Sequence, residues 1–153
     1  PTKECGCAPG MVQKYLNRSS GPLLDRIDIH LEVVPVPFKK LSEQESSETS
    51  ETVRERVLAA RKIQEERFRE HKGVYANAQM NSKLIRQYVV LDEASNELIK
   101  NAMDRLGLSA RAYDRILKVS RTIADLEGEP NVLPHHLSEA IHYRSLDREN
   151  WGG

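Results

Sequence analysis

The sequence is poor in cysteine, in aromatic residues and in long apolar runs, and these shortages exclude several classes of protein. Two cysteines in 153 residues cannot build the disulfide framework of a small secreted domain. No apolar run approaches the roughly 18 residues of a membrane-spanning helix, and the first residues lack a basic and then apolar signal pattern. We therefore expect a soluble, cytoplasmic protein with no membrane partner.

The chain also lacks a surplus of charge of either sign. It has 23 basic and 23 acidic residues, so it offers no broad electrostatic footprint for nucleic acid, and any such contact is expected to be local. Hydrophobic residues make up 39% of the chain, below the roughly 45–50% of ordinary globular proteins. These proportions predict a mainly α-helical protein with a thin core.

The two cysteines, Cys5 and Cys7, are separated by one residue, a spacing that would strain a disulfide between them. They are expected to be free thiols or metal ligands. A structural zinc site needs about four ligands, and this pair supplies two with no second cysteine pair after it. Zinc binding at Cys5 and Cys7 would therefore need further ligands.

Residues 20–33 carry the most informative local pattern of the chain. Apolar and polar positions alternate from residue 27 to 33, which predicts a half-buried strand. The positions expected to face a core are Ile27, Ile29, Leu31 and Val33, and those expected to face away are Asp28, His30 and Glu32. Arg26 stands at the start of this strand, where it would either form an ion pair with Asp25 or Asp28 or reach a phosphate or carboxylate.

Periodicity predicts two helices in the first half of the chain. A short one is expected to end near Asn17 and Arg18, before Gly21 and Pro22. After a polar tract over 42–51, a long amphipathic helix is expected over 52–71 with Gly73 behind it. Its predicted apolar stripe is Val53, Val57, Ala60, Ile63 and Phe68. Its charges favour a solvated face over a nucleic-acid stripe.

Start and stop signals predict the remaining helices. Asn81 or Ser82 begins a short one, Asp92 and Gly107 bound the next, Ser109 and Gly128 bound another, and Pro134 begins the last. The helices of this last part, joined by short turns, predict an antiparallel or orthogonal bundle. In the helix over 109–128, the positions expected to be exposed are Arg111, Arg115, Lys118, Arg121 and Asp125.

Arg111 is expected in the first turn of its helix, where the helix dipole disfavours a cation. A bound phosphate would compensate, because it attracts both the guanidinium and the exposed helix amides. The alternative is a solvated arginine whose electrostatic penalty is screened. Another function that the residues leave open is a helical DNA-binding or scaffolding module that uses Arg115, Lys118 and Arg121.

Three strings resemble the Mg-chelatase-related AAA+ ATPases of the ComM and YifB type. They are GPLLDRIDI at 21–29, LSARAYDRILKVSRTIADL at 108–126 and AIHYRSLDR at 140–148. The resemblance covers nearly the whole chain and implies a helical lid bundle preceded by a short β-strand segment from the end of an ATPase core. The implied organisation is the core end at 1–37, a linker and long helix at 38–90, the lid at 91–148 and a tail at 149–153.

The resemblance implies roles for two arginines in ATP hydrolysis. Arg26 matches the arginine finger that reaches the γ-phosphate of a neighbouring subunit, and Arg111 matches sensor 2 of the lid, with Arg18 a weaker candidate. A guanidinium suits this task because its permanent charge stabilises the transferring phosphoryl oxygens. The resemblance further implies that the parent protein uses ATP and Mg²⁺ as cofactors and forms a homo-oligomeric, hexameric ring. It also implies DNA as the partner, on which ATP hydrolysis would drive branch migration.

The sequence also departs from the family pattern. It has no Gly-x-x-x-x-Gly-Lys-[Ser/Thr] loop and no apolar strand that ends in paired acids, so we expect no ATP hydrolysis and no bound cofactor with this chain alone. Ser19 stands where the family usually has isoleucine. Family members carry further cysteines before the pair that corresponds to Cys5 and Cys7, which would complete a zinc site. The alternative within the same resemblance is a motor subunit for magnesium chelatase-like metal insertion.

Overall fold

The computed structural model describes residues 6–16, 26–31, 33, 35–36 and 48–144. Its elements are helical: α1 (Pro9–Leu16), α4 (Ser50–Arg67), a 3₁₀ turn η1 (Asn77–Gln79), α5 (Ser82–Tyr88), α6 (Glu93–Leu106), α7 (Ala110–Glu127) and α8 (Pro134–His142). The prediction of a mainly α-helical protein is confirmed. Among these described residues, no helix combines the length and the apolarity that crossing a bilayer requires.

Most helices begin and end at the residues that the sequence signals indicate. Asn81, Asp92 and Ser109 are the N-caps of α5, α6 and α7, and each side chain accepts a hydrogen bond from a backbone N–H of the first turn. Gly107 and Gly128 end α6 and α7 with φ of 60° and 75°, in the left-handed region that favours glycine. Local chemistry therefore fixes these boundaries.

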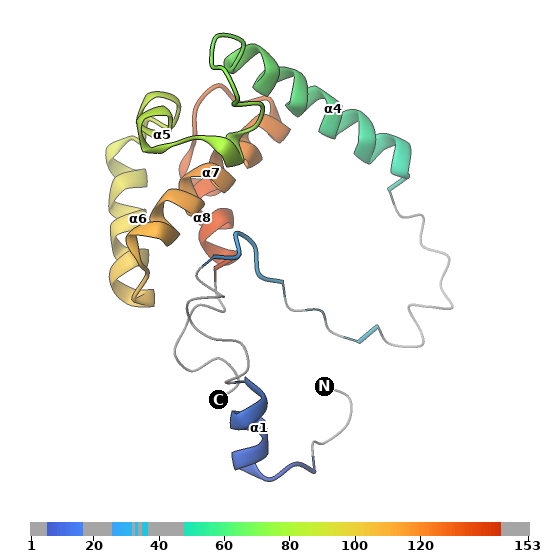
Figure 1. The fold of residues 1–153 in the computed structure, drawn as a ribbon, viewed down its shortest axis with the longest axis vertical. Helices are drawn as coiled ribbons and strands as arrows, with labels where there is room; N and C mark the ends of the chain where they lie inside the picture. Colours follow the sequence, from blue (N-terminus) through green and yellow to red (C-terminus); the bar gives the residue numbers. More distant parts are fainter. Residues whose placement is uncertain (1–5, 17–25, 32, 34, 37–47, 145–153) are drawn as a thin grey trace.

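Helix α7 lies at the centre of the bundle, and α4, α5, α8 and η1 all pack against it (Figure 1). Helix α6 packs against α8. The buried apolar core contains Phe68, Met80, Leu84, Ile85, Val89, Ile99, Ile116, Leu117, Ile123, Ala124, Val132, Leu137 and Ala140. The bundle predicted for the last sixty residues is confirmed, and the end of α4 together with α5 completes its core.

Helix α4 departs from its prediction in length and in burial. It ends at Arg67, four residues before the predicted His71, and a turn leads from there to Gly73. Of the predicted stripe only Ala60 and Phe68 are buried, whereas Val53, Val57 and Ile63 are exposed. The reason is visible in Figure 1, where the N-terminal half of α4 extends beyond the bundle and no described element lies against it.

The strand predicted over 27–33 is not found in the described part of that segment. The predicted exposure of Asp28 is confirmed, but the pattern is reversed elsewhere, because His30 is buried while Ile27 and Ile29 are exposed. A strand needs a neighbouring strand to pair with, and the described residues contain none. Instead, the His30 N–H donates to the Tyr143 carbonyl at 2.8 Å, which places this segment against the end of α8.

Candidate phosphate-binding site

Arg111 occupies the first turn of α7, as the sequence predicts. The Ser109 hydroxyl caps this helix and accepts a hydrogen bond from the Ala112 N–H at 3.1 Å. No acidic residue stands in the first turn of α7, and the Arg111 side chain is exposed. The helix therefore begins with a cation where its dipole favours an anion, which is the arrangement that a bound phosphate would neutralise.

Arg111 lines a pocket of about 280 Å³ on the surface of the bundle, here called the cationic pocket. The residues that line it come from α7, from η1 and from the segment at 26–31: Asp28, Ala78, Arg111, Asp114, Arg115 and Lys118. Arg111, Arg115 and Lys118 are four and three residues apart, so they share one face of α7. Three cations against two carboxylates give the pocket a net positive charge.

The segment that follows Arg26 is attached to the lid at three points. Arg115 Nη1 donates to Asp28 Oδ1, Arg144 Nη1 donates to the Ile27 carbonyl, and the His30 N–H donates to the Tyr143 carbonyl. These contacts connect residues 27–30 with α7 and with the end of α8. Arg26 stands directly before this attached segment, and its side chain is exposed.

The remaining polar residues of the cationic pocket are engaged in the fold. Lys118 Nζ donates to the Ala78 carbonyl at 2.9 Å, and the Ser82 hydroxyl donates to Asp114 Oδ2 at 3.2 Å. These bonds connect α7 with η1 and α5. They hold Lys118 and Asp114 in place in the pocket wall, and the Arg111 side chain is exposed at the helix N-terminus.

The prediction that Arg121 and Asp125 are exposed is wrong. Both residues are 2% exposed. Arg121 Nε donates to Asp125 Oδ1 at 3.1 Å, and its two Nη atoms donate to the carbonyls of Pro130 at 2.8 Å and Glu129 at 2.6 Å. A buried charge is tolerated when it is paired and hydrogen-bonded, and this pair is. The signal that sequence reasoning missed is an Arg and an Asp four residues apart, next to the apolar positions of α7.

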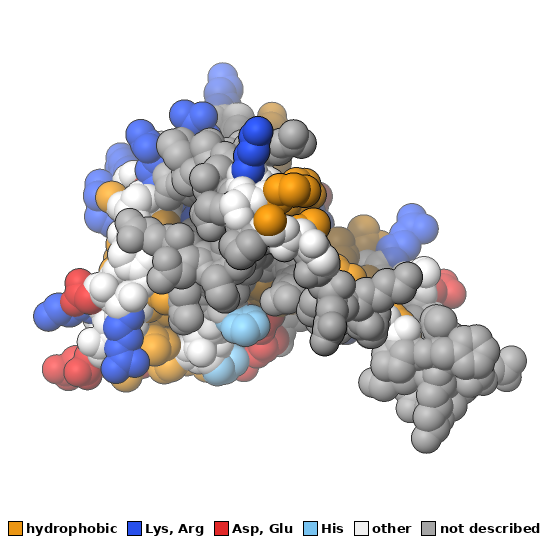
Figure 2. Space-filling model, turned by 90° about the horizontal axis from the view of Figure 1, so that it is seen from below, with side chains coloured by type: hydrophobic (Ala, Val, Ile, Leu, Met, Phe, Trp, Pro, Cys, Tyr) orange, Lys and Arg blue, Asp and Glu red, His pale blue; other side chains and the backbone are white. Residues whose placement is uncertain are grey.

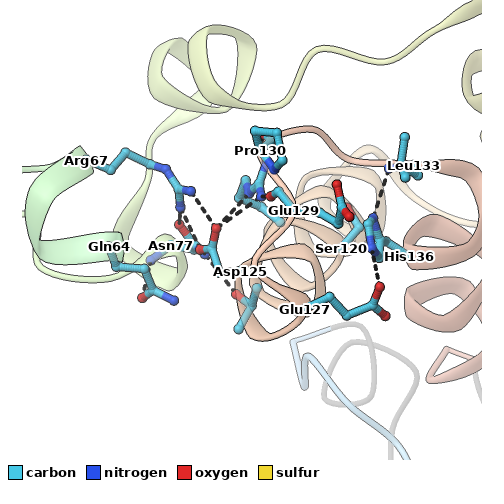
Figure 3. Close-up of polar contacts among 12 residues, drawn as sticks. Gln64, Arg67, Asn77, Ser120, Asp125, Glu127, Glu129, Pro130, Leu133 and His136 are labelled. Atoms are coloured by element: carbon cyan, nitrogen blue, oxygen red, sulfur yellow. Dashed lines mark hydrogen bonds and ion pairs between the residues drawn. The ribbon is translucent and has the colours of Figure 1, made fainter. Parts of the chain in front are cut away.

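Asp125 is the centre of a larger buried network. Arg67 and Asn77 converge on it from α4 and η1 (Figure 3). Burial lowers the pKa of Arg121, the Asp125 carboxylate opposes that shift, and the Arg67 charge adds to it.

The burial of Arg121 removes one of the three residues of the predicted DNA-binding face. On the face shown in Figure 2, the described side chains include acidic as well as basic groups.

Glu127, His135 and His136 form a cluster that was not predicted from the sequence, and their ligand atoms lie within 4.8 Å of one another. His136 Nδ1 accepts the Leu133 N–H at 2.9 Å, so Nε2 carries the proton and donates it to Glu127 Oε2 at 3.0 Å. His136 thus has no lone pair for a metal, and Glu127 with His135 is too small a ligand set. The cluster holds the end of α7 to the start of α8.

Hydrogen bonds from His135, which has the larger effect, and from His136 lower the pKa of the Glu127 carboxyl. Of the other predicted site residues, Arg18 and Cys5 lie outside the described residues, and Cys7 is exposed. Zinc binding at Cys5 and Cys7 stays a prediction.

Comparison with known proteins finds two family matches. Residues 47–144 match the family described as magnesium chelatase, subunit ChlI C-terminal, and residues 1–41 match magnesium chelatase, subunit ChlI. The chain is 46% identical over 142 residues to competence protein ComM of Haemophilus influenzae, which covers 92% of this chain and 27% of that protein. It is 42% identical over 144 residues to the uncharacterized protein YifB of Salmonella typhimurium, covering 93% and 27% of the two chains.

A more distant relative is an uncharacterized protein of Mycobacterium bovis, 33% identical over 142 residues, which cover 93% of this chain and 28% of that protein. The chain therefore spans about a quarter of the length of these relatives.

Proposed function

The chain belongs to the magnesium chelatase subunit ChlI C-terminal family, and we propose on this basis that it supplies two arginines to the nucleotide sites of a ring-forming ATPase. Arg111 binds the phosphates of the nucleotide held by its own subunit. Arg26 reaches the γ-phosphate held by the neighbouring subunit. ATP and Mg²⁺ are bound by parts of the parent protein that correspond to the remaining length of the relatives.

The observation that carries this proposal is the placement of Arg111 at the N-terminus of α7 inside the cationic pocket. The positive end of the helix dipole and an exposed guanidinium act on the same region. Each of these features attracts a phosphate. The first turn of α7 holds no acid, and the two carboxylates of the pocket, Asp28 and Asp114, accept hydrogen bonds from Arg115 and Ser82.

The attachment of residues 27–30 to α7 and α8 supports a joint role for the two arginines. Arg115 lies one helical turn after Arg111 and binds Asp28, two residues after Arg26. A nucleotide that draws Arg111 and α7 toward its phosphates therefore also moves the segment that carries Arg26. In a ring, this connection would couple the state of one nucleotide site to the next.

We further propose that hydrolysis drives movement on branched DNA, on the strength of the similarity to competence protein ComM. The alternative is a motor for metal insertion, as in the magnesium chelatase that gives the family its description. Stimulation of ATP hydrolysis by branched DNA separates the two, because a chelatase motor has no reason to respond to it. A rate that stays unchanged with DNA would favour the alternative.

The proposal is tested by steady-state ATPase rates of the whole ring with Arg111→Ala or Arg26→Ala. Each substitution removes a cation that contacts the transferring phosphoryl group, so kcat is expected to fall at least about 100-fold. Arg86→Ala is the matched control, since Arg86 is an exposed arginine of α5 outside the cationic pocket. Rates within about twofold of the unsubstituted ring correspond to less than about 0.5 kcal/mol and would exclude both contacts.

A further inference from the structure

A second pocket, of about 200 Å³, lies beside the buried network and away from Arg111. The ends of α4 and α5, α7 and the loop after α7 form its walls, which include Arg67, Gln87, Tyr88, Arg121 and Asn131. We call it the two-arginine pocket. None of the described residues that line it is acidic.

Positive charge exceeds negative charge at this pocket. The side chains of Arg67 and Arg121 are 12% and 2% exposed, and one wholly buried carboxylate, Asp125, is paired with both of them. The carbonyls of Glu129 and Pro130 offset part of the remaining charge, because they accept hydrogen bonds from Arg121. Carbonyl dipoles carry no net charge, so the network retains one positive charge in a poorly solvated place.

The two guanidinium groups also retain donor capacity. An arginine has five N–H groups, and within the described residues each side chain makes three hydrogen bonds, while Arg121 Nη2 also lies 3.1 Å from Asp125 Oδ1. Those of Arg67 go to Asn77 and twice to Asp125, and those of Arg121 go to Asp125, Pro130 and Glu129. The amide side chains of Gln87 and Asn131 add neutral donors to the same walls.

We propose that the two-arginine pocket binds a small oxyanion, either a phosphate or a carboxylate group. Its volume is below the roughly 300–1,000 Å³ of sites for drug-sized ligands, which suits one such group and not a nucleotide. Forked, permanently charged donors recognise these oxygens best. A bound oxyanion would neutralise the excess charge and connect α4, α5 and the loop after α7.

Thermal unfolding of the full chain in millimolar sodium phosphate tests the site, with sodium chloride of equal ionic strength as the reference. At a concentration about tenfold above the dissociation constant, binding is expected to raise Tm by roughly 5 °C. Sodium acetate in a parallel titration identifies the ligand class. A larger shift with phosphate assigns the pocket to phosphate groups, and a larger shift with acetate assigns it to carboxylates.

Three variants test whether the rise in Tm comes from binding at the two-arginine pocket. Gln87→Glu, at an exposed position of the pocket wall, introduces a competing carboxylate and is expected to abolish the shift. Asn101→Asp, an exposed residue of α6, adds the same charge elsewhere and should retain the shift. Arg111→Ala should also retain it, which separates this site from the cationic pocket. An absent shift in the unsubstituted chain, or an equal shift in Gln87→Glu, would overturn the proposal.

Discussion

Asp125 accepts hydrogen bonds from both terminal nitrogens of Arg67, with Nη1 at 2.6 Å from Oδ2 and Nη2 at 2.5 Å from Oδ1. This bidentate pair joins α4 to α7 across 58 residues of sequence. The same carboxylate accepts hydrogen bonds from Arg121 and Asn77. A single buried acid thus holds the end of α4, η1 and α7 in one arrangement.

Asp125→Asn is expected to destabilise the protein by about 3–5 kcal/mol, because it leaves two buried guanidinium groups without their anion. The free energy of unfolding, measured with urea, checks this. Asp104→Asn is the control, since Asp104 is an exposed acid of α6, and it should change the free energy by less than about 0.5 kcal/mol. A loss of under 1 kcal/mol for Asp125→Asn would contradict the role assigned to the network.

Arg115→Ala is expected to release the segment that follows Arg26 without unfolding the bundle. The ion pair with Asp28 is partly exposed, so its own contribution to stability is about 1 kcal/mol or less. The released segment should open more often, and hydrogen exchange of the His30 amide, which donates to Tyr143, should speed up several-fold. Exchange in Arg105→Ala, a substitution at an exposed arginine of α6, should stay as in the unsubstituted chain. Equal exchange in both variants would refute the attachment.

Titration of Glu127 is expected to make the stability of the fold depend on pH in the acidic range. Hydrogen bonds from His135 and His136 hold its pKa below the ordinary 4.5, so the folded state binds this proton more weakly than the unfolded state. The resulting stabilisation is complete above about pH 4.5 and is lost as the pH falls through the lowered pKa.

Tm measured between about pH 5 and pH 3 checks this expectation. The decline should be shallower in Glu127→Gln, which cannot titrate, than in the unsubstituted chain. Glu97→Gln, at an exposed position of α6, should leave the slope unchanged. An identical slope in Glu127→Gln would show that the histidine contacts do not favour the ionised carboxylate.

The sequence predicts the helices well where their ends are set by neighbouring residues. Asp92 and Gly107 bound α6, and Ser109 and Gly128 bound α7, because a cap or a left-handed glycine acts within one turn. The placement of Arg111 in the first turn of α7 follows from the same local signal.

Features that depend on distant partners could not be predicted in this way. The burial of Arg121 and Asp125 depends on Arg67, which is 58 residues from Asp125 in sequence. The reversed burial of the segment around His30 depends on Tyr143 and on the lack of a neighbouring strand in the described residues. Alternation of apolar residues indicates a strand only where another strand is present to pair with it.

We propose that Arg26 and Arg111 serve different nucleotide sites. The most direct test is ATP hydrolysis by rings mixed from Arg26→Ala subunits and subunits that cannot bind nucleotide. Neither kind is active alone, yet at a mixed interface the Arg26→Ala subunit binds ATP and its neighbour provides an intact Arg26, so hydrolysis is predicted to recover. Mixtures that use Arg111→Ala should stay inactive, because that arginine acts within its own subunit. Mixtures with Arg26→Ala that also stay inactive would contradict the account.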